Sequence, residues 1–410
     1  MPSIESQAKL ANANRRAIGE SAKSLKIVFH VSRDAKSGTY FRYHNLALAL
    51  KERGHEVTVL SQNGRAWRTC QENREGINYQ ILPGFVVNRL CDYHLNPGIL
   101  GLRALHPLPE ADVHHLFQPF LNSAVPWMQA RREKRYRDAL FAWDWDDLWC
   151  GGLFSEAPAA AWSRWQYRLL EQAEHRLPAR AALVTTCSTY LSDLAKERGA
   201  RATAIVHNGI WPSEVHGDAN KELRDHFGLS QGAFYMGFIG WTHYDATWCL
   251  ELLGRLDASV RLVSCGYDIR RELPHFPGLE SRVDYLGALE NAEARKLMQC
   301  LDVGLLPLSD TPFNRSRLPI KFGEYLAAGC PVVCGSVGEL QRIGNGLKGV
   351  VLLPAEQTVW LNRAVLAIEE IRHSPHAFTP EPRELASRLG WPVLAAQLEK
   401  AYCSYLPCNA

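Results

Sequence analysis

The 410-residue sequence lacks most of the features that assign a chain to a specialised class of protein. It has no apolar run long enough to span a bilayer, and residues 1–23 carry charges without the apolar stretch of a signal peptide. The 11 cysteines include no CxxC pair, which is typical of reduced thiols and not of a disulfide framework. A net charge of +3 is too small to imply nucleic-acid binding. We therefore expect a cytoplasmic protein.

Signatures of several catalytic mechanisms are also missing. The sequence has no P-loop and no GxSxG nucleophile elbow. Its 15 histidines show no spacing typical of metal ligands, so no zinc site is predicted.

What the sequence does contain is a repeated α/β pattern. An apolar strand at residues 25–31 precedes helical spacing at 43–53 and a second strand at 57–60. This βαβ unit predicts a parallel sheet. The pattern starts again at residues 234–240. We therefore expect two Rossmann-like, doubly wound α/β domains that face each other across a cleft at their strand ends.

Four parts are expected along the chain. Residues 1–23 would form a flexible arm, 24–203 the first domain, 204–380 the second domain, and 381–410 a C-terminal helix that packs back on the first domain. Residues 84–110 are rich in Gly, Pro, Asn and His and are predicted to be an irregular loop.

Residues 319–335, PIKFGEYLAAGCPVVCG, combine a clear local structure with a chemical role. Pro319 suits the first turn of a helix, and Gly329 suits its left-handed end before a short strand. The free N–H groups of the helix start, with Lys321 in the first turn, could bind a diphosphate. Glu324 lies one turn further and could accept hydrogen bonds from ribose hydroxyls. The alternative is an ordinary surface helix packed on a sheet.

Within this architecture, four segments resemble GT-B glycosyltransferases, most closely the retaining enzymes of glycosyltransferase family four. They are KIVFHVSRDAKSGTYFRYHNLALALKERGHEVTVL at 26–60, ALVTTCSTYLSDLAKERGARATAIVHNGI at 182–210, VDYLGALENAEARKLMQCLDVGLLPLSD at 283–310, and PIKFGEYLAAGCPVV at 319–333. Their order and spacing together are more specific than any one segment.

The resemblance implies a hexosyltransferase-type enzyme that takes a nucleotide sugar, most often a UDP-sugar, on the second domain and its acceptor on the first. Glu324 would then bind the donor ribose, and Lys321 with the helix start would bind the diphosphate. Gly38 would allow close approach of the backbone to the sugar phosphate. The residues implied around the nucleotide sugar are Gly240, Trp241, Thr242, Gly266, Tyr267, Leu286, Gly287, Ser316 and Arg317.

Three positions depart from the family pattern. The family's second glutamate, eight residues before Glu324, is Ser316 here, and Asp310 is the nearest acidic substitute. An Arg/Lys pair is missing from the loop at residues 240–243, which leaves the diphosphate charge to Arg315, Arg317 and Lys321. Because these cations and a helix start can stabilise the leaving group, we predict transfer without a metal or other cofactor.

A third departure is in the first domain, where the family often has a histidine at the position of Phe117. His115 is the nearest retained histidine and is an acceptor-side candidate. Three further acceptor-side candidates follow a predicted strand: Asp144, Asp146 and Asp147. They could bind acceptor hydroxyls or an amine, hold a metal as the unrelated GT-A enzymes do, or serve only in caps and turns.

Two further clusters each have two interpretations. The tryptophans between residues 143 and 165 could stack on an acceptor, but large aromatics are more often core. The basic run at residues 131–137 could contact an anionic membrane or be a solvated helix face. The rival functions are a sugar-nucleotide epimerase or inverting transferase on the same fold, and a non-catalytic GT-B protein that binds a nucleotide or a partner.

Overall fold

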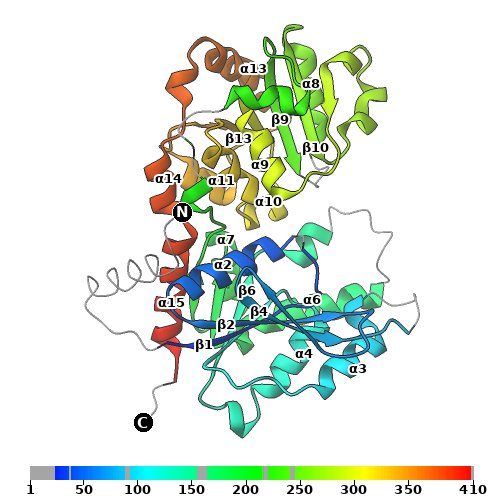
Figure 1. Ribbon diagram of the computed structural model, residues 1–410, viewed down its shortest axis with the longest axis vertical. Helices are drawn as coiled ribbons and strands as arrows, with labels where there is room; N and C mark the ends of the chain where they lie inside the picture. Colours follow the sequence, from blue (N-terminus) through cyan, green and yellow to red (C-terminus); the bar gives the residue numbers. More distant parts are fainter. Residues whose placement is uncertain are drawn as a thin grey trace.

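The computed structural model describes residues 24–36, 38–87, 93–154, 164–214, 216, 220–240 and 245–407. The expected N-terminal arm, residues 1–23, lies outside the described residues. Figure 1 shows two α/β domains stacked end to end, with the C-terminal helix running from one to the other. This confirms the predicted fold class of two Rossmann-like domains.

The first domain is built on an eight-stranded sheet with the order β3-β4-β2-β1-β5-β6-β7-β8. All neighbouring strands are parallel except β3, which pairs with β4 in the antiparallel sense. The strands are β1 (Lys26–His30), β2 (Glu56–Asn63), β3 (Cys70–Arg74), β4 (Ile77–Pro83), β5 (Val113–Phe117), β6 (Leu140–Trp145), β7 (Leu183–Thr186) and β8 (Thr203–Ile205).

Helices cover both faces of this sheet because alternate side chains of each buried strand point to opposite sides. In β1, Ile27 and Phe29 pack under α2 (Tyr40–Glu52), whereas Val28 packs on the side of α4 (Leu121–Ala130). The described part of this domain also contains the α-helices α3 (Pro97–Leu105), α6 (Arg164–Arg180) and α7 (Thr189–Glu197). Since α3 occupies part of residues 84–110, the prediction of an irregular loop there is wrong in part.

The second domain has a six-stranded, fully parallel sheet with the order β11-β10-β9-β12-β13-β14. The strands are β9 (Phe234–Gly240), β10 (Val260–Gly266), β11 (Val283–Tyr285), β12 (Val303–Leu306), β13 (Val332–Gly335) and β14 (Val350–Leu353). Helices α8 (Ala246–Arg255) and α13 (Gln357–His373) pack on one face, and α9 (Asn291–Gln299) and α11 (Ile320–Ala327) pack on the other. Two short helices, α10 (Pro312–Ser316) and α12 (Gly338–Gly344), lie toward the first domain.

The chain crosses between the domains twice, at adjacent points. Ile210 on the first crossing accepts a hydrogen bond from the Trp391 amide (2.9 Å) and donates one to the Leu389 carbonyl (2.8 Å). Helix α14 (Pro382–Leu389) contributes to the core of the second domain, whereas α15 (Trp391–Tyr405) packs against α2 in the core of the first. The C-terminal segment therefore changes domains at Gly390, ten residues later than the boundary predicted at residue 380.

Candidate active site

The 319–335 segment has the local structure that its sequence predicts. Pro319 caps α11 with φ −60° and ψ 128°, Gly329 has the left-handed φ of +76°, and β13 follows. Tyr325 fixes the helix to β9, because its hydroxyl donates to the Gly237 carbonyl (3.0 Å) and accepts from the Ile239 amide (2.9 Å). The start of α11 is thereby held at a defined place over the second sheet.

Lys321 and Glu324 form an ion pair, with 2.6 Å between Lys321 Nζ and Glu324 Oε2. Burial raises the pKa of Cys265 at the end of β10, and the charge of Lys321 opposes this increase. The lysine therefore lies near the end of β10. The glutamate lies near Glu214, whose pKa is raised by burial and further by the Glu324 charge. Both predicted donor-binding side chains therefore lie together, and their charges neutralise each other.

Three glycines form a continuous backbone edge beside this pair. Gly240 and Gly266 are the last residues of β9 and β10, and Gly287 lies just after β11; all three have positive φ, of +151°, +89° and +73°. The Gly266 amide donates to the Gly287 carbonyl (2.8 Å), and the Tyr267 amide donates to the Gly240 carbonyl (2.7 Å). A Cβ at Gly266 would lie 2.4 Å from the Gly240 oxygen, so no side chain fits there.

This edge brings five of the predicted nucleotide-contacting residues together, since Leu286 donates its amide to Ser264 in β10. Trp241 and Thr242, predicted for the same place, lie outside the described residues. In the first domain, Gly38 has φ +59° and open space around its Cα, as its predicted role requires.

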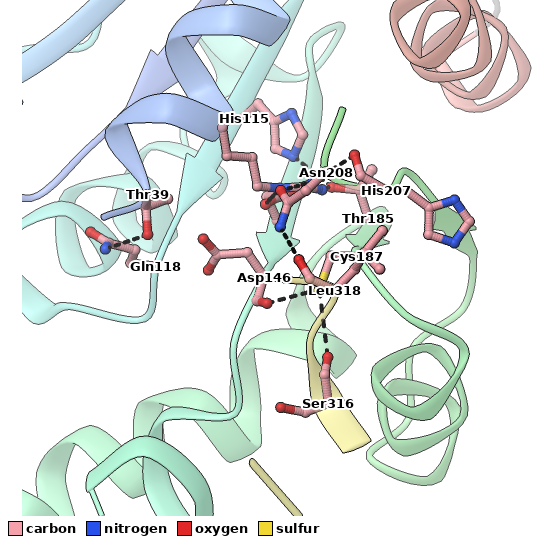
Figure 2. Close-up of polar contacts among 12 residues, drawn as sticks. Thr39, His115, Gln118, Asp146, Thr185, Cys187, His207, Asn208, Ser316 and Leu318 are labelled. Carbon is pink, nitrogen blue, oxygen red and sulfur yellow. Dashed lines mark hydrogen bonds and ion pairs between the residues drawn. The ribbon is translucent and has the colours of Figure 1, made fainter. Parts of the chain in front are cut away.

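Ser316, in contrast, does not face a cleft. It is fully buried, and its hydroxyl donates to the Phe313 carbonyl (2.8 Å) and accepts from the Leu148 amide (3.3 Å). Its carbonyl accepts from Ser188 Oγ (2.6 Å) across the domain boundary. The same carbonyl accepts from Cys187 Sγ (3.5 Å), as Figure 2 shows. The assignment of Ser316 to nucleotide-sugar binding is therefore wrong, because this side chain is part of the joint between the domains.

The predicted substitutes for the missing groups have other partners. Asp310 and Arg315 form a bidentate ion pair (2.5 and 2.7 Å) at a half-exposed surface, so these two predicted substitutes are partners of each other. Arg317 donates to Asn314 Oδ1 and lies over the Phe313 ring, 4.1 Å from its centroid. Lys321 is thus the predicted cation that lies beside Glu324.

On the first domain, a cavity of about 300 Å³ opens near the carboxyl ends of β1 and β5. Its lining is polar and aromatic and includes Arg33, Thr39, Tyr93, Gln118 and Trp149. Thr39 Oγ1 accepts a hydrogen bond from Gln118 Nε2 (2.9 Å), and Gln118 has a left-handed φ of +69°. Such a lining suits a sugar or another polyhydroxylated acceptor. Sequence reasoning missed Thr39 and Gln118, although both lie beside residues it used, Gly38 and Phe117.

Asp146 lies beside this cavity and is the most unusual of the three predicted acids. It is buried, and its Oδ1 has no hydrogen-bond partner among the described residues. Figure 2 shows its carboxyl group pointing toward Thr39 and Gln118. Burial, with the charges of Asp147 and Asp144, raises the pKa of Asp146 well above its usual value. Burial also raises the pKa of Asp147, to about 6, against the opposing charges of Arg317 and Arg42.

Asp144 has a structural partner instead. It forms a fully buried ion pair with Arg42 (2.7 and 2.9 Å) and accepts from Thr185 Oγ1 (2.5 Å). Arg42 also donates to the His207 carbonyl and to Asn208 Oδ1, both at 3.1 Å. Asn208 Nδ2 in turn donates to the Leu318 carbonyl (2.7 Å), which ties this network to the second domain (Figure 2).

His115 is on the wrong face of the sheet for acceptor binding. It is fully buried, and its ring contacts Tyr402 of α15 (Nδ1 to hydroxyl, 2.5 Å) and Thr185 Oγ1 (3.1 Å). Burial lowers its pKa to about 4. The prediction of His115 as an acceptor contact is therefore wrong, and the histidine supports α15 and the Asp144 network instead.

The tryptophans divide between the two interpretations. Trp143 and Trp145 are fully buried and stack at 5.0 Å between centroids, as core residues do, whereas Trp149 lines the cavity. Trp162 lies outside the described residues. No group of three or more metal-ligating side chains occurs among the residues that the structure describes, and none of their helices is long and apolar enough to cross a bilayer.

Two family models match this chain in sequence. A "Glycosyl transferase 4-like domain" matches residues 37–209, and "Glycosyl transferases group 1" matches residues 232–369. A putative teichuronic acid biosynthesis glycosyltransferase, TuaH, of Bacillus subtilis (strain 168) is 27% identical over 343 residues, which are 75% of this chain and 80% of that protein. The 2-deoxystreptamine N-acetyl-D-glucosaminyltransferase of Streptomyces fradiae is 25% identical over 62% of each chain.

Solved structures are similar over nearly the whole chain. Sucrose-phosphate synthase from Thermosynechococcus elongatus has a TM-score of 0.72 at 14% identity, covering 93% of this chain and 99% of that one. HepE from Anabaena, in complex with UDP and glucose, has a TM-score of 0.65 at 16% identity, covering 93% and 100%. At this identity the structural likeness shows the shared fold.

Proposed function

The chain belongs to the group 1 glycosyltransferases, GT-B enzymes that use nucleotide sugars, and from this premise we propose that it transfers a sugar from a UDP-sugar with retention and without a metal. The observation that carries the proposal is the Lys321–Glu324 ion pair beside the glycine edge of the second domain. UDP is the favoured nucleotide because the HepE structures hold UDP or UDP-glucose on the same fold.

Binding of the donor would exchange the partners of the Lys321–Glu324 ion pair for groups of the nucleotide. A bound diphosphate would take Lys321 and the free N–H groups at the start of α11, both of which favour negative charge. Glu324 would then be released to accept hydrogen bonds from the ribose hydroxyls. The base would lie along Gly266 and Gly287, where the absence of a Cβ lets a flat ring approach the backbone.

The same groups would serve the chemical step. As the bond between the sugar and the diphosphate breaks, negative charge grows on the leaving phosphate, and fixed donors already aimed at it stabilise the transition state. Lys321 and the α11 N–H groups supply that stabilisation, which is why we propose that no metal is needed.

The acceptor would occupy the first-domain cavity beside Asp146. Burial and the neighbouring carboxylates raise the pKa of Asp146, which favours its protonated form, and a protonated carboxyl group can donate a hydrogen bond to an acceptor oxygen. Thr39 and Gln118 offer further polar contacts on the same wall. We propose that these three residues, and not His115, position the acceptor.

A thermal-shift titration with UDP, GDP, ADP and their sugar conjugates, with and without EDTA, tests the donor site. A ligand at 100 times its Kd adds about 2.7 kcal/mol to stability, which is readily measured. We expect UDP to give the largest increase in melting temperature, both with and without EDTA. The Lys321→Ala variant should lose this increase. Lys348→Ala is the matched control, since Lys348 pairs with Glu381 on an exposed surface of the same domain. A shift that requires manganese would contradict the proposal.

The buried position of Ser316 also supports a second candidate, a GT-B protein that binds UDP but does not transfer a sugar. The two candidates separate on product. Radiolabelled UDP-sugar incubated with acceptor extracts yields labelled product if transfer occurs, and NMR of the anomeric proton then distinguishes retention from inversion. Binding of UDP without any labelled product would favour the non-catalytic protein.

A further inference from the structure

A second concave site lies on the first domain, between α4 and α6. The groove has a volume of about 360 Å³ and opens on the helical layer that covers the sheet on the side away from α2. In Figure 1, α4 lies beyond the first sheet from the second domain. The groove shares no lining residue with the cavity beside Asp146.

The two helices present matching faces to this groove. Helix α4 contributes Leu121, Val125 and Met128, and Arg132 lies in the turn just after it; α6 contributes Leu169, Ala173, Arg176 and Arg180. Both sets have the spacing i, i+4, i+7, i+11, which is one face of an α-helix. Each helix connects parallel strands, so the two run in the same direction. The apolar residues therefore meet at one end of the groove and the arginines at the other.

The arginine end carries charge that the described residues do not neutralise. The structure records no acidic partner, among the described residues, for any arginine that lines the groove: Arg131, Arg132, Arg176 and Arg180. Burial lowers the pKa of Arg131, and the charges of Arg201, Arg180 and Arg132 lower it further. Like charges held this close favour a bound anion.

The remainder of the basic run behaves differently, and the run is not one helix face as its sequence suggests. Helix α4 ends at Ala130, and residues 134–136 form a separate 3-10 turn. Arg135 pairs with Glu133 (2.7 Å) and Arg137 with Asp138 (3.5 Å) on the exposed surface. These two arginines are therefore a natural control for the groove arginines.

We propose that the α4–α6 groove binds an anionic phospholipid, with the phosphate on the arginine end and the glycerol and upper acyl chain on the apolar end. The apolar end is what selects a lipid, since a free phosphate would leave it uncovered. Leu169 is 38% exposed and Trp165, four residues earlier on α6, is 50% exposed. Exposed apolar and tryptophan side chains beside clustered arginines are suited to the surface of an anionic membrane.

Co-sedimentation of the full chain with phosphatidylglycerol or phosphatidylcholine vesicles tests this site. We expect binding to the anionic vesicles, at least a tenfold loss in the double variant Arg176→Glu/Arg180→Glu, and a several-fold loss in Leu169→Ser. The charge-matched double variant Arg135→Glu/Arg137→Glu should lose less than threefold. Circular-dichroism melting establishes that each variant is folded, and no step of the test depends on donor binding or sugar transfer.

Three results would overturn the proposal. Equal losses in the two double variants would mean that only net charge matters. Equal binding to both kinds of vesicle would remove the role of the phosphate charge. Calorimetric binding of inorganic pyrophosphate to the arginines, with no vesicle binding, would identify a site for a free anion and not for a lipid.

Discussion

The buried ion pair between Arg42 and Asp144 gives the sharpest test of the first-domain network. Both side chains are 1% exposed, and the two contacts are 2.7 and 2.9 Å. Asp144→Ala leaves the guanidinium buried without its carboxylate, a change that costs about 3–5 kcal/mol in comparable sites. With a urea m-value of about 2–3 kcal/mol/M for a domain of this size, the unfolding midpoint should fall by about 1–2.5 M.

The assay is urea unfolding followed by circular dichroism, with the UDP-induced thermal shift measured in parallel. We expect the nucleotide shift to remain, since the donor residues lie in the other domain. The double variant Arg42→Met/Asp144→Leu should recover much of the lost stability, because it removes both charges together. A loss below about 1 kcal/mol in Asp144→Ala, or no recovery in the double variant, would refute the argument that the pair is fully desolvated.

Three other predictions concern the donor site and a buried acid of the first domain. Lys321→Ala should weaken UDP binding by about 10–100-fold and leave uridine binding nearly unchanged, whereas Glu324→Ala should weaken both, as measured by calorimetry. Gly266→Ala should lower stability and UDP affinity more than Gly287→Ala, because an added Cβ meets backbone at 2.4 Å in the first and open space in the second. Burial raises the pKa of Glu174 from 4.5 to about 7, so its share of stability is full below pH 4.5 and is lost as the pH rises through 7. Glu174→Gln should therefore flatten the pH dependence of the unfolding free energy between pH 5 and 8, by up to about 3 kcal/mol relative to wild type.

Those parts of the fold that depend on local pattern could be predicted from the sequence. The strand predicted at residues 234–240 is β9 with the same bounds, and the turn at Gly329 follows from its place between a helix and Pro331. Helix α3 was missed because its glycines and its first proline suggest a loop. Its signal was Asn96, whose side chain accepts from the Gly98 amide as an N-cap.

The site was less predictable. The wrong predictions of site residues concern which face of a helix or strand is covered by another element, and the sequence does not show this. His115 and Phe117 point to the same side of β5 by simple alternation, but the sequence does not tell that α15, nearly 300 residues later, packs over that side. Asp310 was proposed as a substitute on spacing alone, and spacing does not reveal that Arg315 lies within reach of the same carboxylate. Long-range partners of this kind come only from the assembled structure.

The way in which the two domains meet explains why position 316 holds a serine and not a glutamate. Cys187 Sγ contacts the carbonyls of both Asp146 (2.8 Å) and Ser316 (3.5 Å), so the two backbones are neighbours across the joint. A glutamate at 316 would bury a carboxylate beside two acids whose pKa values are already raised, at a cost of several kcal/mol. Serine instead satisfies the hydrogen bonds of its hydroxyl within the joint.

We infer that acidic groups near the reacting sugar come from the first domain, through Asp146 and Asp147. Asp146→Asn should then impair transfer while leaving UDP binding intact, and a loss of UDP binding would place the acid in the donor site instead.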